Sequence, residues 1–320
     1  MVKERAYRAR LYLAFVAIYV VWGSTYLAIR YGIESFAPLR MMGVRSLIAG
    51  SILYGFGRLS SGEGLTAAQW RSALLLGTLF FVGGHGALAW GEKRIPSGVA
   101  SLLVATIPVW LALMETTLGR GRLTPRLLLG LSLGFGGVVL LAEPGALLPG
   151  ESIDLFAALV VLAGALSWAL GTVVSRGLAA PKSAVLFSGA SLLAGGGGLV
   201  LLSFLSGETA PPGEVSMKSV LAVLYLIVFG SIVGFVAYVW LLRVETASKV
   251  GTYAFVNPGI AVFLGWLGGG ESLSARILLA TVLMVAGVAI IVTQKAENHE
   301  RKPLHDRTPM ARSNPERESG

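Results

Sequence analysis

The chain has no cysteine and little charge. Among its 320 residues, 13% are Asp, Glu, Lys or Arg, whereas 54% are hydrophobic and the mean hydropathy is +0.73. The absence of thiols excludes disulfides, thiolate metal sites and cysteine nucleophiles. The scarcity of charge excludes a water-soluble globule, because too little polar surface remains to cover one. This composition is typical of an integral membrane protein.

Apolar stretches recur along almost the whole chain. A helix that crosses a bilayer needs about 20 apolar residues, whereas a barrel strand shows about ten residues of alternating polarity. Runs such as LLVATIPVWLALM do not alternate. We therefore predict an all-α integral membrane protein with ten transmembrane helices. The predicted spans are Leu11–Ile29, Pro38–Gly57, Trp70–Gly91, Ser97–Leu118, Leu127–Ala142, Ile153–Ser175, Ala184–Ser206, Val220–Leu242, Ala247–Gly270 and Ile277–Thr293.

The basic residues predict the orientation of these spans. Short loops rich in Lys and Arg stay on the cytoplasmic side. With the N-terminus inside, 19 of the 26 Lys and Arg residues fall on that side, and the longest outer loop, Glu143 to Asp154, has three acids and no base. We therefore expect both termini in the cytoplasm. The formal charge of +9 then requires no nucleic acid as a partner.

The polar ends and the central loop complete the predicted organisation. It comprises a cytoplasmic N-terminus (1–10), a first five-helix repeat (11–142), an extracytoplasmic loop (143–152), a second repeat (153–293) and a disordered cytoplasmic tail (294–320). From Lys295 onward the tail carries six bases and five acids, which nearly cancel. We therefore expect neither nucleic acid nor anionic lipid to bind it.

The two repeats are related by an offset of about 150 residues. Trp90 precedes Pro108 by eighteen residues, and Trp240 precedes Pro258 by the same eighteen. Five helices is an odd number, so the second copy enters the membrane from the opposite side. Inverted repeats of this kind build many secondary transporters, which hold the substrate between the halves near the midplane. The alternative is a duplicated membrane protein without transport.

Several segments resemble the EamA-like transporters of the drug/metabolite transporter superfamily. They are WGSTYLAIR, PSGVASLLVATIPVWLALME and ASKVGTYAFVNPGIAVFLGWLGGGESLS, within a resemblance that runs from Leu11 to Thr293. The resemblance implies a ten-helix inner-membrane carrier, often an exporter of amino acids, other metabolites or drugs. One departure concerns an acidic residue before the fifth helix of each half. Glu271 supplies it in the second half, but Gly121 replaces it in the first.

Pro108 and Pro258 fall near the middle of predicted spans. Each proline leaves the carbonyl four residues earlier without its partner, at Val104 and Ala254. Such carbonyls are tolerated at membrane depth where they line a cavity. A packing kink is the alternative explanation.

Polar and aromatic side chains near these prolines are the predicted substrate-binding residues. They are Trp22, Ser24, Thr25, Tyr26, Thr106, Trp110, Ser167, Trp168, Thr172, Tyr253 and Asn257. An unpaired amide is costly in hydrocarbon, so Asn257 must bond a neighbour, water or the substrate. Each Ser or Thr has the alternative of bonding a carbonyl of its own helix. Trp22, Trp110 and Trp168 are candidates for stacking on a substrate.

Three ionisable residues within or near the spans are candidates for proton or charge coupling: His85, Glu115 and Arg45. His85 suits proton exchange near neutral pH, with a neutral, hydrogen-bonded histidine as the alternative. Arg45 suits either a carboxylate substrate or pairing with a structural acid.

Enzyme motifs are missing. The chain has no Walker sequence and no HExxH, and two of its three histidines, His299 and His305, lie in the tail. We expect no cofactor, no metal and no catalytic site. The partners are a small-molecule substrate and the lipid bilayer, and the oligomeric state is left open. The function predicted is secondary transport of a small organic solute by export, either coupled to protons or without a coupling ion. The alternative is an integral-membrane enzyme or lipid-handling protein.

The predicted topology can be tested with reporter fusions. A fusion at Leu147 should report the extracytoplasmic side, and a fusion at Glu297 the cytoplasmic side, because an odd number of helices separates them. Both fusions reporting the same side would contradict the inverted repeat.

Overall fold

The structure is a computed structural model that describes residues 2–95, 97–118, 124–141 and 154–269, with isolated positions between 275 and 290. Some predictions lie outside these residues: the loop 143–152, the tail 294–320, and the comparison of Gly121 with Glu271. The predicted span Ile277–Thr293 is described at a few positions only.

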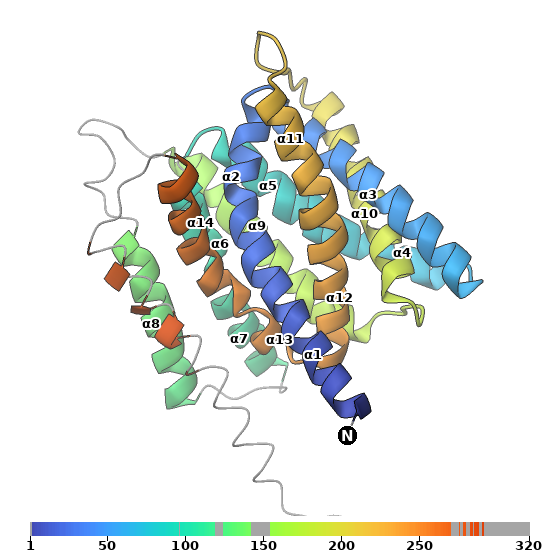
Figure 1. Ribbon diagram of the computed structural model, residues 1–320, viewed down its shortest axis with the longest axis horizontal. Helices are drawn as coiled ribbons and strands as arrows, with labels where there is room; N and C mark the ends of the chain where they lie inside the picture. Colours follow the sequence, from blue (N-terminus) through green and yellow to red (C-terminus); the bar gives the residue numbers. More distant parts are fainter. Residues whose placement is uncertain are drawn as a thin grey trace, which may run out of the picture.

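Every regular element in the described ranges is a helix, which confirms the all-α prediction (Figure 1). In chain order these are α1 (Val2–Val16), η1 (Ala17–Val21), α2 (Trp22–Ile33), α3 (Pro38–Ser61), α4 (Ala67–Gly77), η2 (Thr78–Gly86), α5 (Ala87–Glu92), α6 (Ser97–Val104), α7 (Ile107–Thr117), α8 (Pro125–Leu141), α9 (Leu155–Val174), η4 (Ser175–Gly177), α10 (Ala184–Leu205), α11 (Met217–Tyr225), η5 (Leu226–Gly234), α12 (Phe235–Val244), α13 (Ala247–Val250) and α14 (Tyr253–Gly269).

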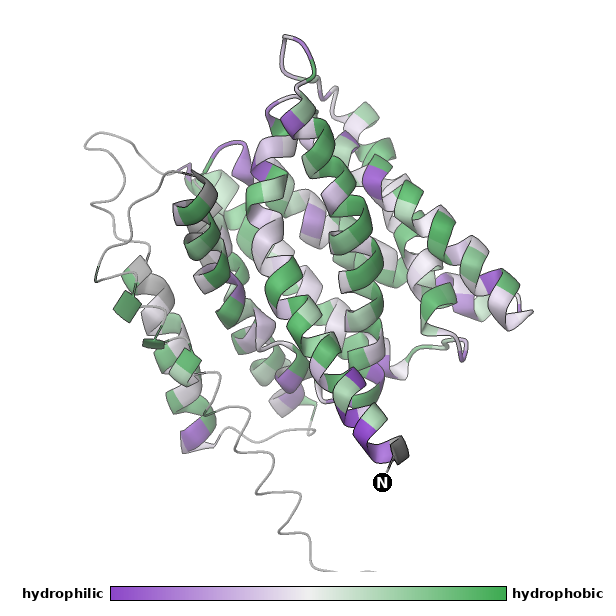
Figure 2. Ribbon diagram, viewed as in Figure 1, coloured by the Kyte–Doolittle hydropathy of each residue, from purple (hydrophilic) through white to green (hydrophobic). Residues whose placement is uncertain are grey.

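Five helical stretches of the described chain are long and apolar enough to span a bilayer. They are Glu4–Ile33, Ala67–Glu92, Leu155–Gly177, Ala184–Leu205 and Met217–Val244. Large apolar side chains also face outward, among them Leu13, Phe56 and Leu201, each more than half exposed. Figure 2 shows hydrophobic residues along the outer helices over most of their length. Such continuous apolar exposure suits lipid and not water.

Several helices begin at a side chain that caps the first turn. The side chains of Thr66, Asp154, Ser183, Ser216 and Thr246 each accept a bond from the backbone N–H three residues later. These caps matter because the first N–H groups of a helix have no partner inside it. The helix ends are therefore set by local sequence.

Helices α3 and α10 pack antiparallel along a row of glycines. On α3, Gly43, Gly50 and Gly57 recur every seven residues and meet α10 directly. A Cβ added at Gly50 would lie 2.8 Å from the backbone nitrogen of Leu193 and 3.0 Å from the carbonyl oxygen of Gly189. Small residues at such spacing let two backbones approach closely, which is how helices associate in lipid.

Three spans contain a π-helical segment. Segment η1 lies between α1 and α2, η2 between α4 and α5, and η5 between α11 and α12. The last two are each nine residues long and interrupt helices that correspond in the two halves of the sequence. A π-helix shifts the backbone hydrogen-bond pattern and often marks a functional site.

Two further spans are broken, but not where the sequence suggested. The fourth span divides at Ala105 and Thr106, so that Pro108 is the second residue of α7 and not a mid-helix residue. The ninth divides at Gly251 and Thr252, and Pro258 lies inside α14. A proline at the start of a helix is well tolerated because its missing N–H would be unpaired there anyway.

The packing of α3 against α10 predicts a position-specific cost. Gly50→Ala should lower stability by about 1 to 3 kcal/mol, because its methyl group would meet the backbone of α10. Gly55→Ala is the matched control, since a Cβ there meets no atom within 4 Å. Thermal unfolding of the two purified variants in detergent measures the difference. Equal midpoints would show that the close approach does not limit stability.

Candidate functional site

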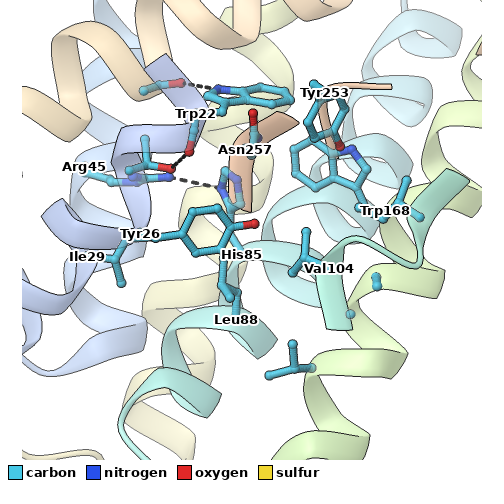
Figure 3. A pocket seen from close by; sticks show the side chains of 17 residues that line it. Trp22, Tyr26, Ile29, Arg45, His85, Leu88, Val104, Trp168, Tyr253 and Asn257 are labelled. Atoms are coloured by element: carbon cyan, nitrogen blue, oxygen red, sulfur yellow. Dashed lines mark hydrogen bonds between the residues drawn. The ribbon is translucent and has the colours of Figure 1, made fainter. Parts of the chain in front are cut away.

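A cavity with a volume of about 60 Å³ lies among helices from both halves of the chain (Figure 3). Helices α2, α9 and α14 supply most of its wall, and η2 and η5 contribute one or two residues each. The lining residues are Trp22, Thr25, Tyr26, Ile29, Arg45, Gly84, His85, Leu88, Val104, Ile107, Val161, Gly164, Ala165, Trp168, Gly230, Tyr253 and Asn257. Eight of these are residues that the sequence predicted: Trp22, Thr25, Tyr26, Arg45, His85, Trp168, Tyr253 and Asn257.

A carbonyl in each π-helical segment accepts a bond from a side chain of another span. Trp22 Nε1 donates to the Gly230 carbonyl in η5 at 3.1 Å. Ser167 Oγ donates to the Leu79 carbonyl in η2 at 2.9 Å. In the amide orientation that satisfies both acceptors, the Asn257 nitrogen donates to the carbonyls of Tyr19 in η1 and of Tyr253, each at 3.0 Å. Three side chains thus donate to backbone carbonyls of the π-helical segments from other spans.

Aromatic rings form one side of the cavity. The ring of Trp22 meets the ring of Trp168 at a centroid distance of 5.5 Å and that of Tyr253 at 4.9 Å, both edge to face. Trp168 Nε1 donates to the hydroxyl of Tyr238 at 3.0 Å, and that hydroxyl also bonds Thr172 Oγ1. Edge-to-face contacts and a satisfied indole N–H hold these rings in fixed positions.

Arg45 and His85 form the polar side. The Arg45 Nη2 and His85 Nδ1 atoms lie 3.1 Å apart, as drawn in Figure 3. A guanidinium has no acceptor, so Nη2 donates and Nδ1 accepts. In this arrangement His85 is therefore a neutral, hydrogen-bonded histidine, which is one of the two alternatives that the sequence left open.

Other predicted binding residues lie outside the cavity lining. Ser24 bonds the Val21 carbonyl and the hydroxyl of Tyr225. Thr106 donates to the Leu103 carbonyl and accepts from the indole of Trp110, next to the break before α7. Ser167 and Thr172 also make the bonds described above, and Thr172 donates to its own helix at the Trp168 carbonyl.

The remaining candidates also lie off the cavity. Pro108 is buried at the start of α7, and Pro258 lies within α14 one residue after the lining residue Asn257. Glu115 is buried two residues before the end of α7. The freed carbonyl expected at Val104 belongs to a residue that does line the cavity.

The EamA-like transporter family matches residues 9–142 and 155–293, which is most of the chain. A protein of Escherichia coli K12 named "Uncharacterized inner membrane transporter YedA" is 36% identical over 89% of this chain and 91% of its own length. The chain belongs to the EamA-like transporter family. It is therefore a membrane transporter.

More distant similarities agree with this assignment. The "Uncharacterized transporter YoaV" of Bacillus subtilis is 25% identical over 87% of this chain and 95% of its own length. A solved crystal structure superimposes with a TM-score of 0.71 at 21% identity, covering 89% of this chain and 98% of that chain, and so shares the fold. Both family-matched segments of this EamA-like transporter contribute to the cavity lining.

Two residues next to the cavity lining, Tyr238 and Glu92, were missed by sequence reasoning. Tyr238 is 1% exposed and orients Trp168, but a tyrosine in an apolar run gives no signal of its own. Glu92 is the last residue of α5, and both of its carboxyl oxygens are buried without a hydrogen-bond partner among the described residues. Sequence reasoning did not select Glu92 because it lies at the end of a span, where the side chains of acidic residues usually reach the membrane–water interface.

The site suits binding more than chemistry. Within the part of the chain that the structure describes, no three His, Asp or Glu side chains lie close enough to hold a metal ion. The lining is instead apolar and aromatic with a few polar groups, which is the usual composition of a small-molecule site.

Two of the three predicted stacking tryptophans, Trp110 and Trp168, differ in position, and this difference predicts their effects. Trp168→Ala should weaken substrate binding by about 1 to 3 kcal/mol, because it removes a ring from the cavity wall. Trp110→Ala is the matched control, since Trp110 lies outside the lining. Binding affinity measured on both purified variants tests this. Equal losses in the two variants would contradict a role for the Trp168 ring.

Proposed function

We propose that this EamA-like transporter carries a small organic solute through the central cavity by alternating access between two inverted five-helix repeats. The solute has an apolar or aromatic body, as amino acids, related metabolites and drug-like molecules do. The observation that carries the proposal is a cavity whose aromatic and polar lining comes from both family-matched segments. Its volume in this conformation, about 60 Å³, is smaller than the roughly 300 to 1,000 Å³ of small-molecule sites, so the cavity must widen to admit the solute.

Alternating access requires paired elements that rearrange around a fixed site. Segments η2 and η5 support such a pairing, because each is a nine-residue π-helical segment and each touches the cavity, through His85 and Gly230 respectively. The ten-helix inverted arrangement is part of this proposal.

The proposed location is the inner membrane, with both termini in the cytoplasm and transport outward. The name of the Escherichia coli relative and the bias of basic residues support the location and the orientation. Export follows from the resemblance to the family alone.

We further propose that proton coupling, where it occurs, uses Glu92 in place of the sequence candidates His85 and Glu115. His85 Nδ1 is occupied by Arg45. Neither Glu115 nor Glu92 belongs to the cavity lining, so the choice between the two acids rests on the carboxyl oxygens of Glu92, which are buried without a hydrogen-bond partner among the described residues. Glu92 lies four residues after Leu88, which lines the cavity and belongs to the same helix, α5. Buried carboxyl groups in membrane spans commonly relay protons.

The function is tested by resistance and by flux. Cells that overexpress the protein should tolerate toxic amino acid analogues or drugs better than cells that express Trp168→Ala. Purified protein in proteoliposomes should then move the same compound. Sensitisation of the cells would indicate uptake. A hydrolytic activity in purified protein without any flux would replace the transport proposal with an integral-membrane enzyme.

Glu92→Gln separates coupling from transport. The variant should keep exchange of solute across the membrane but lose acceleration by a pH gradient, because the amide cannot take up and release a proton. Flux in proteoliposomes with and without an imposed gradient measures both properties. Glu115→Gln is the control and should keep the acceleration. Full gradient dependence in Glu92→Gln would exclude Glu92 as the coupling group.

A further inference from the structure

Arg45 is an unusual residue for its position. It lies eight residues into α3 from Pro38 and is 2% exposed, which places it among the largest fully buried side chains of the described chain. A buried cation in a membrane protein costs several kcal/mol unless a partner compensates it. The groups that surround Arg45 therefore indicate what it is for.

Its one hydrogen-bond partner among the described residues is a neutral ring. His85 accepts through Nδ1 and cannot cancel the charge. The imidazole is itself held between two aromatic rings, with centroid distances of 5.0 Å to Trp168 and 5.3 Å to Phe81. This arrangement orients the guanidinium without neutralising it.

The remaining nitrogens of Arg45 are unsatisfied. Nε and Nη1 are buried and have no hydrogen-bond partner in the described part of the chain. Among the described residues that line the cavity there is no Asp or Glu. The nearby Gly230 carbonyl already accepts from Trp22, and a Cβ built on Gly230 would lie 3.7 Å from Nη1. The missing side chain at Gly230 thus leaves the approach to Nη1 open once the cavity widens.

We propose that Arg45 binds a carboxylate of the transported solute, and that His85 is the positioning residue for its guanidinium. This inference rests on the proposed function. One carboxylate can pair with the free N–H of Nη2 together with that of Nη1 or Nε, the two-bond geometry that guanidinium groups favour. Both unsatisfied nitrogens are shielded in this conformation, so the carboxylate binds when the space between α3 and η5 opens.

The charged and aromatic residues of the cavity lining restrict the class of solute that can bind. A single arginine matches a single negative charge, whereas a phosphate ester would require further cations, and the lining has none. The apolar part of the solute then lies against the rings of Trp168, Trp22 and Tyr253. The substrate class is accordingly a monocarboxylate with an aromatic or branched apolar body. The carboxylate, and not an amino group, is the feature recognised, because no acidic side chain lines the cavity.

The test compares carboxylic acids with their neutral amides. Pairs such as 3-phenylpropionate and 3-phenylpropionamide, or 4-methylpentanoate and its amide, are added to purified protein in proteoliposomes, and binding and exchange are measured. The protein should prefer each acid by roughly 10- to 100-fold, as expected for hydrogen bonds to a charged group. Arg45→Gln should remove the preference while keeping the amide affinity. Arg45→Lys should keep part of it, because lysine supplies charge without the planar fork.

Two controls separate this role from a structural one. Arg58→Gln, on the exposed last turn of the same helix, should leave the acid preference unchanged. Thermal unfolding of Arg45→Gln should occur at or above the midpoint of the parent protein, since the substitution removes an uncompensated buried charge. A large fall in that midpoint would show that Arg45 holds the fold and would overturn the proposal.

The outcomes also separate the two proposals. Equal transport of acids and amides by the parent protein would overturn carboxylate recognition and leave transport standing. Retention of the acid preference in Arg45→Gln would likewise overturn carboxylate recognition by Arg45 and leave transport standing. If the protein transports none of the acids or amides and gives cells no resistance, both carboxylate recognition and the transport proposal are overturned.

Discussion

The satisfaction of backbone carbonyls inside the membrane is the constraint on which the rest of this structure depends. Lipid offers no hydrogen bonds, so each interruption of a helix must be completed by the protein itself. In the described part of this transporter three π-helical segments interrupt spans, and Trp22, Ser167 and Asn257 each donate to one of them from another helix. These bonds connect α2, α9 and α14 to the interrupted spans, and these three helices form most of the cavity wall. The cavity is therefore bounded by helices whose side chains bond backbone carbonyls of other spans.

Close packing between α3 and α10 holds the helix that supplies the charged residue of the cavity lining. Helices α3 and α10 approach backbone to backbone along Gly43, Gly50 and Gly57, and this contact fixes the helix that carries Arg45. The guanidinium is held by His85, which is in turn held by Trp168 and Phe81. A rigid helix and a stack of rings thus keep a buried charge beside an apolar cavity. Preorganisation of this kind lowers the cost of binding, since few side chains must be ordered when the solute arrives.

The residues chosen from the sequence fall into three groups for physical reasons. Trp22, Trp168, Tyr253 and Asn257 line one cavity, because large polar or aromatic side chains near the middle of spans pack toward the interior between helices. Thr106 bonds the Leu103 carbonyl at the break before α7, and Thr172 bonds a carbonyl of its own helix, as hydroxyl groups in helices often do. Trp110 was placed with the first group but bonds Thr106 and lies outside the lining. Helical position alone did not separate it from Trp168, because the face that each tryptophan presents depends on the neighbouring helices.

The sequence by itself determined that this is an all-helical membrane protein, that its two halves are related, and that it resembles EamA-like transporters. Hydropathy, charge bias and repeat spacing are local properties, and they follow from the need to match a bilayer of fixed thickness. Only the tertiary structure decided which polar groups meet. It paired Arg45 with a neutral histidine 40 residues away, left Glu92 without a hydrogen-bond partner in the described chain, and placed the helix breaks before the prolines. These outcomes depend on contacts between helices far apart in the chain. The residue pattern of one span does not determine which other helices pack against it.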